Sequence, residues 1–274
     1  MVILIKKIYD FYLNASIHVA LSVYSFIRIT EIYFDLTYNE TLNYFIFFGT
    51  ITGYNFVKYA GVAKLHHRSL TDALKSIQIF SFFSFLVMCY YGCFLPAKTL
   101  FIVIPFSLTT ILYAVPFLSG FQKNLRTLSY LKIIVVAFVW CGVTVLIPVF
   151  DSQKGIEVTI IFLAIQRFLI VTVLILPFDI RDVKYDSLSL QTIPKKIGVR
   201  KTKRLGLGLI IISLIIEYFL EQHNQSKSSF LLFLFLVIIF LMRSKKEQTK
   251  YYSSFWVEAL PIFWWLTLLG FRNF

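Results

Sequence analysis

The chain has 274 residues, of which 58% are hydrophobic and 15% charged, and its mean hydropathy is +0.76. A soluble domain of this length could not cover so much apolar side chain with polar surface, so this class of protein is excluded. The formal net charge of +13 comes from basic residues in short segments between apolar runs. Such segments are typical of cytosolic loops in membrane proteins, and nucleic acid is not expected as a partner.

Nine apolar runs follow one another along the chain, and most of them contain the roughly 20 helical residues that cross a hydrocarbon core. They cover residues 14–34, 41–62, 73–95, 99–118, 130–150, 158–178, 205–220, 230–242 and 254–271. We therefore predict an all-α integral membrane protein, a single membrane domain over residues 1–274 with about nine transmembrane helices. The eighth run is short enough to be interfacial instead.

The basic residues also predict the orientation of the chain in the membrane. If the N-terminus is cytosolic, the lead-in segment and the even-numbered connections together hold most of the 27 Lys and Arg residues. We therefore expect an integral protein of the cell or inner membrane with its N-terminus in the cytosol. The three cysteines are odd in number and lie within predicted spans, which argues against a disulfide framework.

The stretch "LPFDIRDVKYDS", residues 176–187, places Asp179, Asp182 and Asp186 in a largely apolar chain. On one helix the three carboxylates would fall within about 60° of arc, with Arg181 and Lys184 pointing away. Carboxylates on one face repel each other unless a cation lies between them, and Mg²⁺ combines one or two carboxylates with water and phosphate ligands. The alternative is a solvated helix end, where Asp179 caps a new helix that begins after Pro177.

The longer segment "DIRDVKYDSLSLQTIPKKIG" resembles the second aspartate-rich motif of the UbiA superfamily of membrane prenyltransferases. The residues that match this motif in kind are Asp179, Arg181, Asp182, Asp186, Thr192 and Gly198. The resemblance implies a nine-helix bundle over essentially the whole chain, with the motif after the sixth helix and cytosolic loops forming a cap. The stretch "FLSGFQKNLRTLSYLK" is similar to the basic loop of the family, with Lys123 and Arg126 near Tyr113.

The resemblance also implies an activity, the Mg²⁺-dependent transfer of an isoprenyl group from an isoprenyl diphosphate to a membrane-soluble, often aromatic acceptor. Asp179, Asp182 and Asp186 are then the catalytic residues that hold the metal. The residues that would bind the diphosphate are Asn55, Lys58, Lys123, Arg126 and Arg181.

The first aspartate-rich motif of the family is degenerate in this chain. In "GYNFVKYAGVAK" Asn55 remains, but Phe56, Tyr59 and Ala63 stand at the aspartate positions, so a second Mg²⁺ site cannot form from them. Lys58 lies one turn from Asn55 on the same face. It either binds phosphate in place of that Mg²⁺ or extends toward the headgroups at the helix end, and the sequence leaves both open.

Three residues are candidates for the acceptor site: His18, Tyr59 and Arg167. His18 could take a proton from the acceptor, or could form hydrogen bonds between helices. Arg167, near mid-membrane, indicates either a function or a buried partner. Two other functions stay open, a non-catalytic UbiA-fold protein that binds lipid or a membrane partner, and a transporter with His18 and Arg167 along its pathway.

Overall fold

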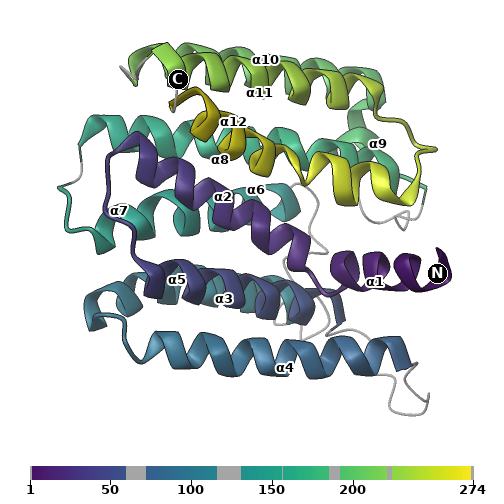
Figure 1. The fold of residues 1–274 in the computed structure, drawn as a ribbon. Helices are drawn as coiled ribbons and strands as arrows, with labels where there is room; N and C mark the ends of the chain where they lie inside the picture. The colour runs from purple at the N-terminus through teal and green to yellow at the C-terminus, as the bar shows by residue number, and fades with distance from the viewer. Residues whose placement is uncertain are drawn as a thin grey trace.

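The computed structural model describes residues 2–59, 72–115, 131–155, 157–184, 192–220 and 224–272, and within these ranges every regular element is a helix (Figure 1). The elements are α1 (Val2–Asn14), α2 (Ile17–Tyr33), α3 (Glu40–Tyr59), α4 (Asp72–Gly92), α5 (Ala97–Ala114), α6 (Leu131–Cys141), η3 (Gly142–Leu146), α7 (Ile147–Asp151), α8 (Val158–Asp182), α9 (Ile193–Ile197), α10 (Val199–Phe219), α11 (Asn224–Arg243), η4 (Tyr252–Val257) and α12 (Leu260–Arg272). The two η elements are π-helical turns.

The apolar runs of the sequence correspond to long helical segments. Among the described residues, six segments are long and apolar enough to cross a membrane, and they support an integral membrane protein. They are α4, α5, the continuous segment α6–η3–α7, α8, most of α11, and η4 with α12. The remaining long helices, α2, α3 and α10, follow the predicted pattern in position, and their crossing of the membrane stays a prediction.

The eighth apolar run belongs to a longer helix than the sequence indicated. α11 has 20 residues, because the polar residues 224–229 extend the helix in front of the apolar run. At 1.5 Å per residue it is about 30 Å long, the thickness of a hydrocarbon core. The part of α11 from Ser226 to Arg243 is among the six segments that are long and apolar enough to cross a membrane, and its crossing stays a prediction.

The helices run alongside one another in a bundle whose central member is α2 (Figure 1). Most of the 17 residues of α2 are buried, and α2 packs against α3, η3 and α12. α8 packs against α6 and α10, while α11 packs against α12. α4 contacts mainly α3, and among its described residues only Ile77 and Ser84 are buried, so the other faces of α4 suit contact with lipid.

One end of the bundle gathers α1, α9 and the beginning of η4 (Figure 1). α3 and α8 also end on this side, and α6 begins there, because consecutive helices of the bundle run in opposite directions. This is the end that the basic connections assign to the cytosol.

Cysteine labelling from the two sides of the membrane tests this orientation. In a variant without Cys89, Cys93 and Cys141, a single cysteine at Lys195 or Lys245 should react with an impermeant maleimide from the cytosolic side only. Cysteines at Lys98 and Lys154 serve as matched controls and should react from the opposite side. Labelling of all four positions from one side would contradict the predicted topology.

Candidate functional site

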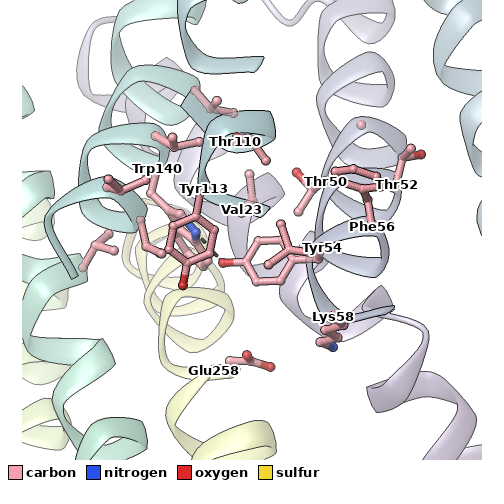
Figure 2. Close-up of a pocket in the computed structure, with 18 of the residues that line it drawn as sticks. Val23, Thr50, Thr52, Tyr54, Phe56, Lys58, Thr110, Tyr113, Trp140 and Glu258 are labelled. Carbon is pink, nitrogen blue, oxygen red and sulfur yellow. Dashed lines mark hydrogen bonds between the residues drawn. The ribbon is translucent and has the colours of Figure 1, made fainter. Parts of the chain in front are cut away.

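A cavity of about 930 Å³ lies between α2, α3, α4, α5, α6, α8 and the η4–α12 segment. Most of its lining is aliphatic and aromatic, including Ile46, Phe106, Val139 and Leu174. Figure 2 shows Tyr54, Tyr113 and Trp140 around the middle of the cavity, with Lys58 and Glu258 beyond them toward one end. The cavity therefore has a large apolar body and a charged end.

Charged side chains reach the cavity from helix ends that meet on the predicted cytosolic side. Among the described residues that line it, the charged ones are Lys58 at the end of α3, Lys132 at the start of α6, Arg181 and Asp182 at the end of α8, Lys250 before η4, and Glu258 before α12. Because cations outnumber carboxylates in this set, the charged end suits an anionic group.

Lys132 forms the central ion pair of the charged end. Its Nζ lies 2.7 Å from Asp179 Oδ1 and 4.0 Å from Asp182 Oδ2, and the Asp179 side chain is only 1% exposed. α8 continues through Pro177 and ends at Asp182, so both carboxylates lie in its last turn, where the helix dipole disfavours negative charge. Asp179 therefore does not cap a new helix. The positive charge beside the Asp179 and Asp182 carboxylates is the ammonium group of Lys132.

Asp179 and Asp182 lie three residues apart in the last turn of α8, and a turn follows Asp182. Asp186 itself lies outside the described residues, as do Lys123 and Arg126. Their predicted roles stay predictions.

Arg181 does not point away from the carboxylates as the helical periodicity indicated. Its Nε donates to Asp182 Oδ1 at 2.8 Å and its guanidinium donates to Ser254 Oγ at 3.2 Å. The guanidinium therefore holds the Asp182 carboxylate at the cavity and connects the end of α8 to η4.

Asn55, Lys58 and Tyr59 hold the junction between α1 and α2. Ser16 has a left-handed backbone conformation (φ 64°) that separates the two helices, and its hydroxyl donates to Asn55 Oδ1 at 2.8 Å. Lys58 Nζ donates to the same hydroxyl at 2.9 Å, and the Tyr59 hydroxyl donates to the carbonyl of Asn14 at 3.1 Å. Lys58 also lines the cavity, whereas the lining does not include Asn55 or Tyr59.

His18 and Arg167 lie within the helix bundle and outside the cavity lining. His18 is bonded through Nδ1 to the Tyr12 hydroxyl (2.7 Å) and through Nε2 to the Phe255 carbonyl (2.9 Å), which matches its alternative role between helices. Arg167 is fully buried and donates to the carbonyl of Phe26 at 3.0 Å, with its guanidinium 4.0 Å from the centre of the Phe26 ring. The partner of this cation is thus a carbonyl and an aromatic face.

Three residues of the charged end, Lys132, Lys250 and Glu258, were not among the candidates from the sequence. Lys132 is a basic residue near the start of the fifth apolar run, and Lys250 precedes the ninth. Glu258 falls within the ninth run, and an acidic residue inside a predicted span is itself a signal of function.

The charged end also continues to α1. Lys250 Nζ donates to Asp10 Oδ1 at 2.7 Å, and the Tyr251 hydroxyl donates to the same oxygen at 3.0 Å. The hydrogen bond from Lys250 lowers the pKa of Asp10 below its usual value, because it stabilises the ionised carboxylate. The first helix is thereby tied to the segment that leads into η4.

Three structures of known proteins resemble this architecture along almost the whole chain. A UbiA homologue from Archaeoglobus fulgidus bound to DMAPP and Mg²⁺ has a TM-score of 0.58 at 11% identity, covering 96% of this chain and 99% of its own. The same protein bound to GPP and Mg²⁺ has a TM-score of 0.59 at 10% identity, with 96% and 100% covered. The chain has the UbiA fold. A structure from work on digeranylgeranylglyceryl phosphate synthase in membranes has a TM-score of 0.56 at 16% identity, with 98% of each chain covered.

Sequence comparison alone does not reach this relationship, since no family model and no curated protein sequence matches the chain. Identities of 9–16% leave the fold as the shared property.

The described part of the cavity contains no cluster of three or more His, Cys, Asp or Glu side chains that could hold a metal ion. Mg²⁺ needs only one or two protein carboxylates when phosphate and water supply the other ligands. Asp182 lines the cavity and meets that requirement, whereas Asp179 is buried against Lys132. The donors present therefore fit an ion held largely by a diphosphate.

Removal of Lys132 tests the ion pair. Lys132→Ala should lower the free energy of unfolding by about 3 kcal/mol, because it removes the cation that is paired with the buried Asp179 carboxylate. The double variant Lys132→Ala/Asp179→Asn should recover part of that loss, since it also removes the charge. Thermal unfolding in detergent, followed by circular dichroism, measures both variants. Equal stability of the single variant and the wild type would contradict a structural role for this pair.

Proposed function

We propose that the chain is a UbiA-like intramembrane prenyltransferase that moves an isoprenyl group from an isoprenyl diphosphate to a membrane-soluble acceptor. The observation that supports this function is the cavity of about 930 Å³, which joins a cationic end to a long apolar and aromatic body within the UbiA fold. An amphiphile with a diphosphate head and a hydrocarbon tail matches both parts. The similar structures of the UbiA homologue contain DMAPP or GPP, which are isoprenyl diphosphates.

The cations of the charged end act on the leaving group. Lys58, Lys132 and Arg181 all line the cavity and belong to three different helices, so they surround the charged end. As the bond between C1 and the diphosphate oxygen lengthens, negative charge grows on the diphosphate, and fixed cations in a low-dielectric site stabilise it. Arg181 is held in place by Asp182 and Ser254, which limits the reorganisation needed.

The aromatic residues act on the isoprenyl group. Tyr54, Tyr113 and Trp140 lie next to the charged end (Figure 2), where C1 of a bound donor would be placed. Trp140 Nε1 donates to the Tyr54 hydroxyl oxygen at 2.6 Å, so the two rings hold each other in orientation. Ring faces stabilise an allylic cation, and the apolar lining keeps water away from it.

Asp182, together with Asp186 of the segment outside the described residues, would hold Mg²⁺ in this proposal. When bound, the ion would neutralise charge on the diphosphate and favour its departure. Arg181 and Lys132 orient the Asp182 carboxylate from two sides, at 2.8 Å and 4.0 Å.

One observation favours the second candidate, a non-catalytic protein that binds lipid or a partner. Asp179 matches the family motif in kind, yet it is buried and paired with Lys132 and does not face the cavity freely. Under this interpretation the cavity still binds an amphiphile, but the diphosphate bond is not broken.

Measurement of diphosphate release separates the two candidates. Purified protein would be incubated with Mg²⁺, isotope-labelled isoprenyl diphosphates of several lengths, and a membrane lipid extract as the source of acceptor. A prenyltransferase should release diphosphate and incorporate label into the extract. Saturable binding of the same diphosphates without release, in protein shown to be folded, would favour the non-catalytic candidate.

Lys58 provides a sharper test of the charged end. Lys58→Ala should weaken diphosphate binding by roughly ten- to a hundredfold, because a charge-assisted contact contributes about 1.5 to 3 kcal/mol. Lys58→Met keeps the apolar stem and should weaken binding equally. Calorimetric titration with geranyl diphosphate measures both variants. If Lys58→Met binds as well as the wild type, the residue serves the helix end and the α1–α2 junction alone.

Phe106 provides a test of how the apolar body limits the length of the donor. A Cβ atom at Gly142 would overlap the Phe106 ring, which lines the cavity, so Gly142→Ala should displace this ring and shorten the longest diphosphate that is bound. Gly208→Ala is the matched control, because no other atom lies near the Cβ position there. Competition binding with diphosphates of increasing length is the measurement. An unchanged length preference in folded Gly142→Ala protein would rule out this role for Phe106.

A further inference from the structure

Glu258 is a cavity residue whose backbone is fixed by its neighbours. It follows the π-helical turn η4, and its N–H donates to the carbonyl of Ser253 at 3.2 Å, the five-residue spacing of a π-helix. The Ser22 hydroxyl of α2 donates to the Glu258 carbonyl. Ser254, Val257 and Pro261 share its helical face and line the same cavity, so the side chain projects into this space.

The Glu258 carboxylate has no hydrogen bond and no ion pair with another residue in the described part of the chain. Figure 2 shows it across the cavity from Lys58, whose ammonium is directed to Ser16 Oγ at 2.9 Å. By contrast, Asp10, Asp179 and Asp182 each have a cation beside them. A carboxylate within a membrane bundle that lacks such a partner is costly, and its position indicates a ligand that supplies the missing donor.

The position of Glu258 selects the kind of ligand. It lies at the charged end with Lys58, and the rings of Tyr54, Tyr113 and Trp140 follow toward the apolar body (Figure 2). If the diphosphate binds the cations and the isoprenyl chain lies in the apolar body, C1 of the donor and the attacking atom of the acceptor meet in this region. A diphosphate would be repelled by the carboxylate, so the partner of Glu258 is the acceptor.

We propose, on the basis of the function proposed above, that Glu258 is a catalytic residue that takes the hydroxyl proton of the acceptor. The hydroxyl oxygen forms a bond to C1 of the isoprenyl group, and the bond between C1 and the diphosphate oxygen breaks. The diphosphate leaves with the electron pair of that bond, and the proton of the hydroxyl passes to the Glu258 carboxylate. No oxidant, reductant or further reactant is needed.

This assignment also limits the class of acceptor. A carboxylate attracts a hydrogen-bond donor and repels an anion, so the reacting end of the acceptor carries a neutral hydroxyl and no carboxylate or phosphate. Phenols and aliphatic alcohols share this property. The apolar surroundings further require that the rest of the acceptor be lipid-soluble.

Several charged or titratable groups surround Glu258 and influence its protonation. They are Tyr12 of α1, Tyr54 and Lys58 of α3, Arg181 and Asp182 of α8, and Lys250 before η4. From α2, His18 directs both ring nitrogens to other partners, Tyr12 and the Phe255 carbonyl. Among these cations, Lys58 and Arg181 attract the Glu258 carboxylate electrostatically.

The test compares Glu258→Gln and Glu258→Asp with the wild type in two assays. Calorimetry with geranyl diphosphate and Mg²⁺ measures donor binding, which should stay within about threefold of the wild type or become tighter in the Gln variant. Transfer of labelled geranyl groups to a membrane lipid extract should fall by about 10²- to 10⁴-fold in the Gln variant, the usual effect of losing a general base. The Asp variant should keep part of the activity.

Two further readouts separate a catalytic role from a structural one. The wild-type rate should fall as the pH is lowered and Glu258 is protonated, and this fall should be absent in the Gln variant. An extract whose hydroxyl groups have been acetylated should not accept label from the wild type.

Other results would overturn the assignment. Equal rates and equal pH profiles for wild type and Glu258→Gln would make Glu258 a structural counter-charge to Lys58 while leaving the proposed function intact. A loss of Mg²⁺-dependent donor binding in the Gln variant would make it a metal ligand. Absence of transfer by the wild-type protein would overturn the proposed function and this role with it.

Discussion

The hydrocarbon interior of a membrane offers no water, so each polar group inside the bundle must find its partner within the protein. The Arg167 guanidinium contacts the carbonyl and the aromatic ring of Phe26, and Asp179 pairs with Lys132. Glu217 accepts hydrogen bonds from Tyr33 and Gln166. In these three cases the partners lie on different helices, so the contacts connect α2, α6, α8 and α10.

In the cavity, the protein supplies partners for only some of the polar side chains. At its charged end, lysine and arginine side chains from α3, α6 and α8 face space that a ligand can fill. Lys132 neutralises a carboxylate of the aspartate segment, and Lys58 stands near the degenerate first motif. The positive charge of this end thus comes mainly from lysine and arginine side chains. Two complete aspartate motifs would instead supply positive charge through bound metal ions. The arrangement suits an anion that binds with at most one metal ion.

Much of the fold could be predicted from the sequence, because long apolar runs between basic connections leave little choice of secondary structure or membrane placement. The aspartate segment was also found from sequence, through residues Asp179 and Asp182 that the structure places at the cavity end of α8. The partners of these residues could not be found in the same way. Lys132 and Glu258 belong to segments distant in sequence from α8, and the packing of α6 and η4 against α8 brings them to the site.

The left-handed turn at Ser16 has a consequence for the affinity of any anion that enters the cavity. A lysine side chain has about 2 kcal/mol of rotamer entropy, part of which is lost when it is immobilised on a ligand. Lys58 already donates to Ser16 Oγ and to the carbonyl of Leu13 at 3.4 Å, so folding has restricted it before an anion arrives. The break between α1 and α2 at Ser16 therefore preorganises the Lys58 ammonium group. Ser16 thereby lowers the entropy that Lys58 loses when an anion binds.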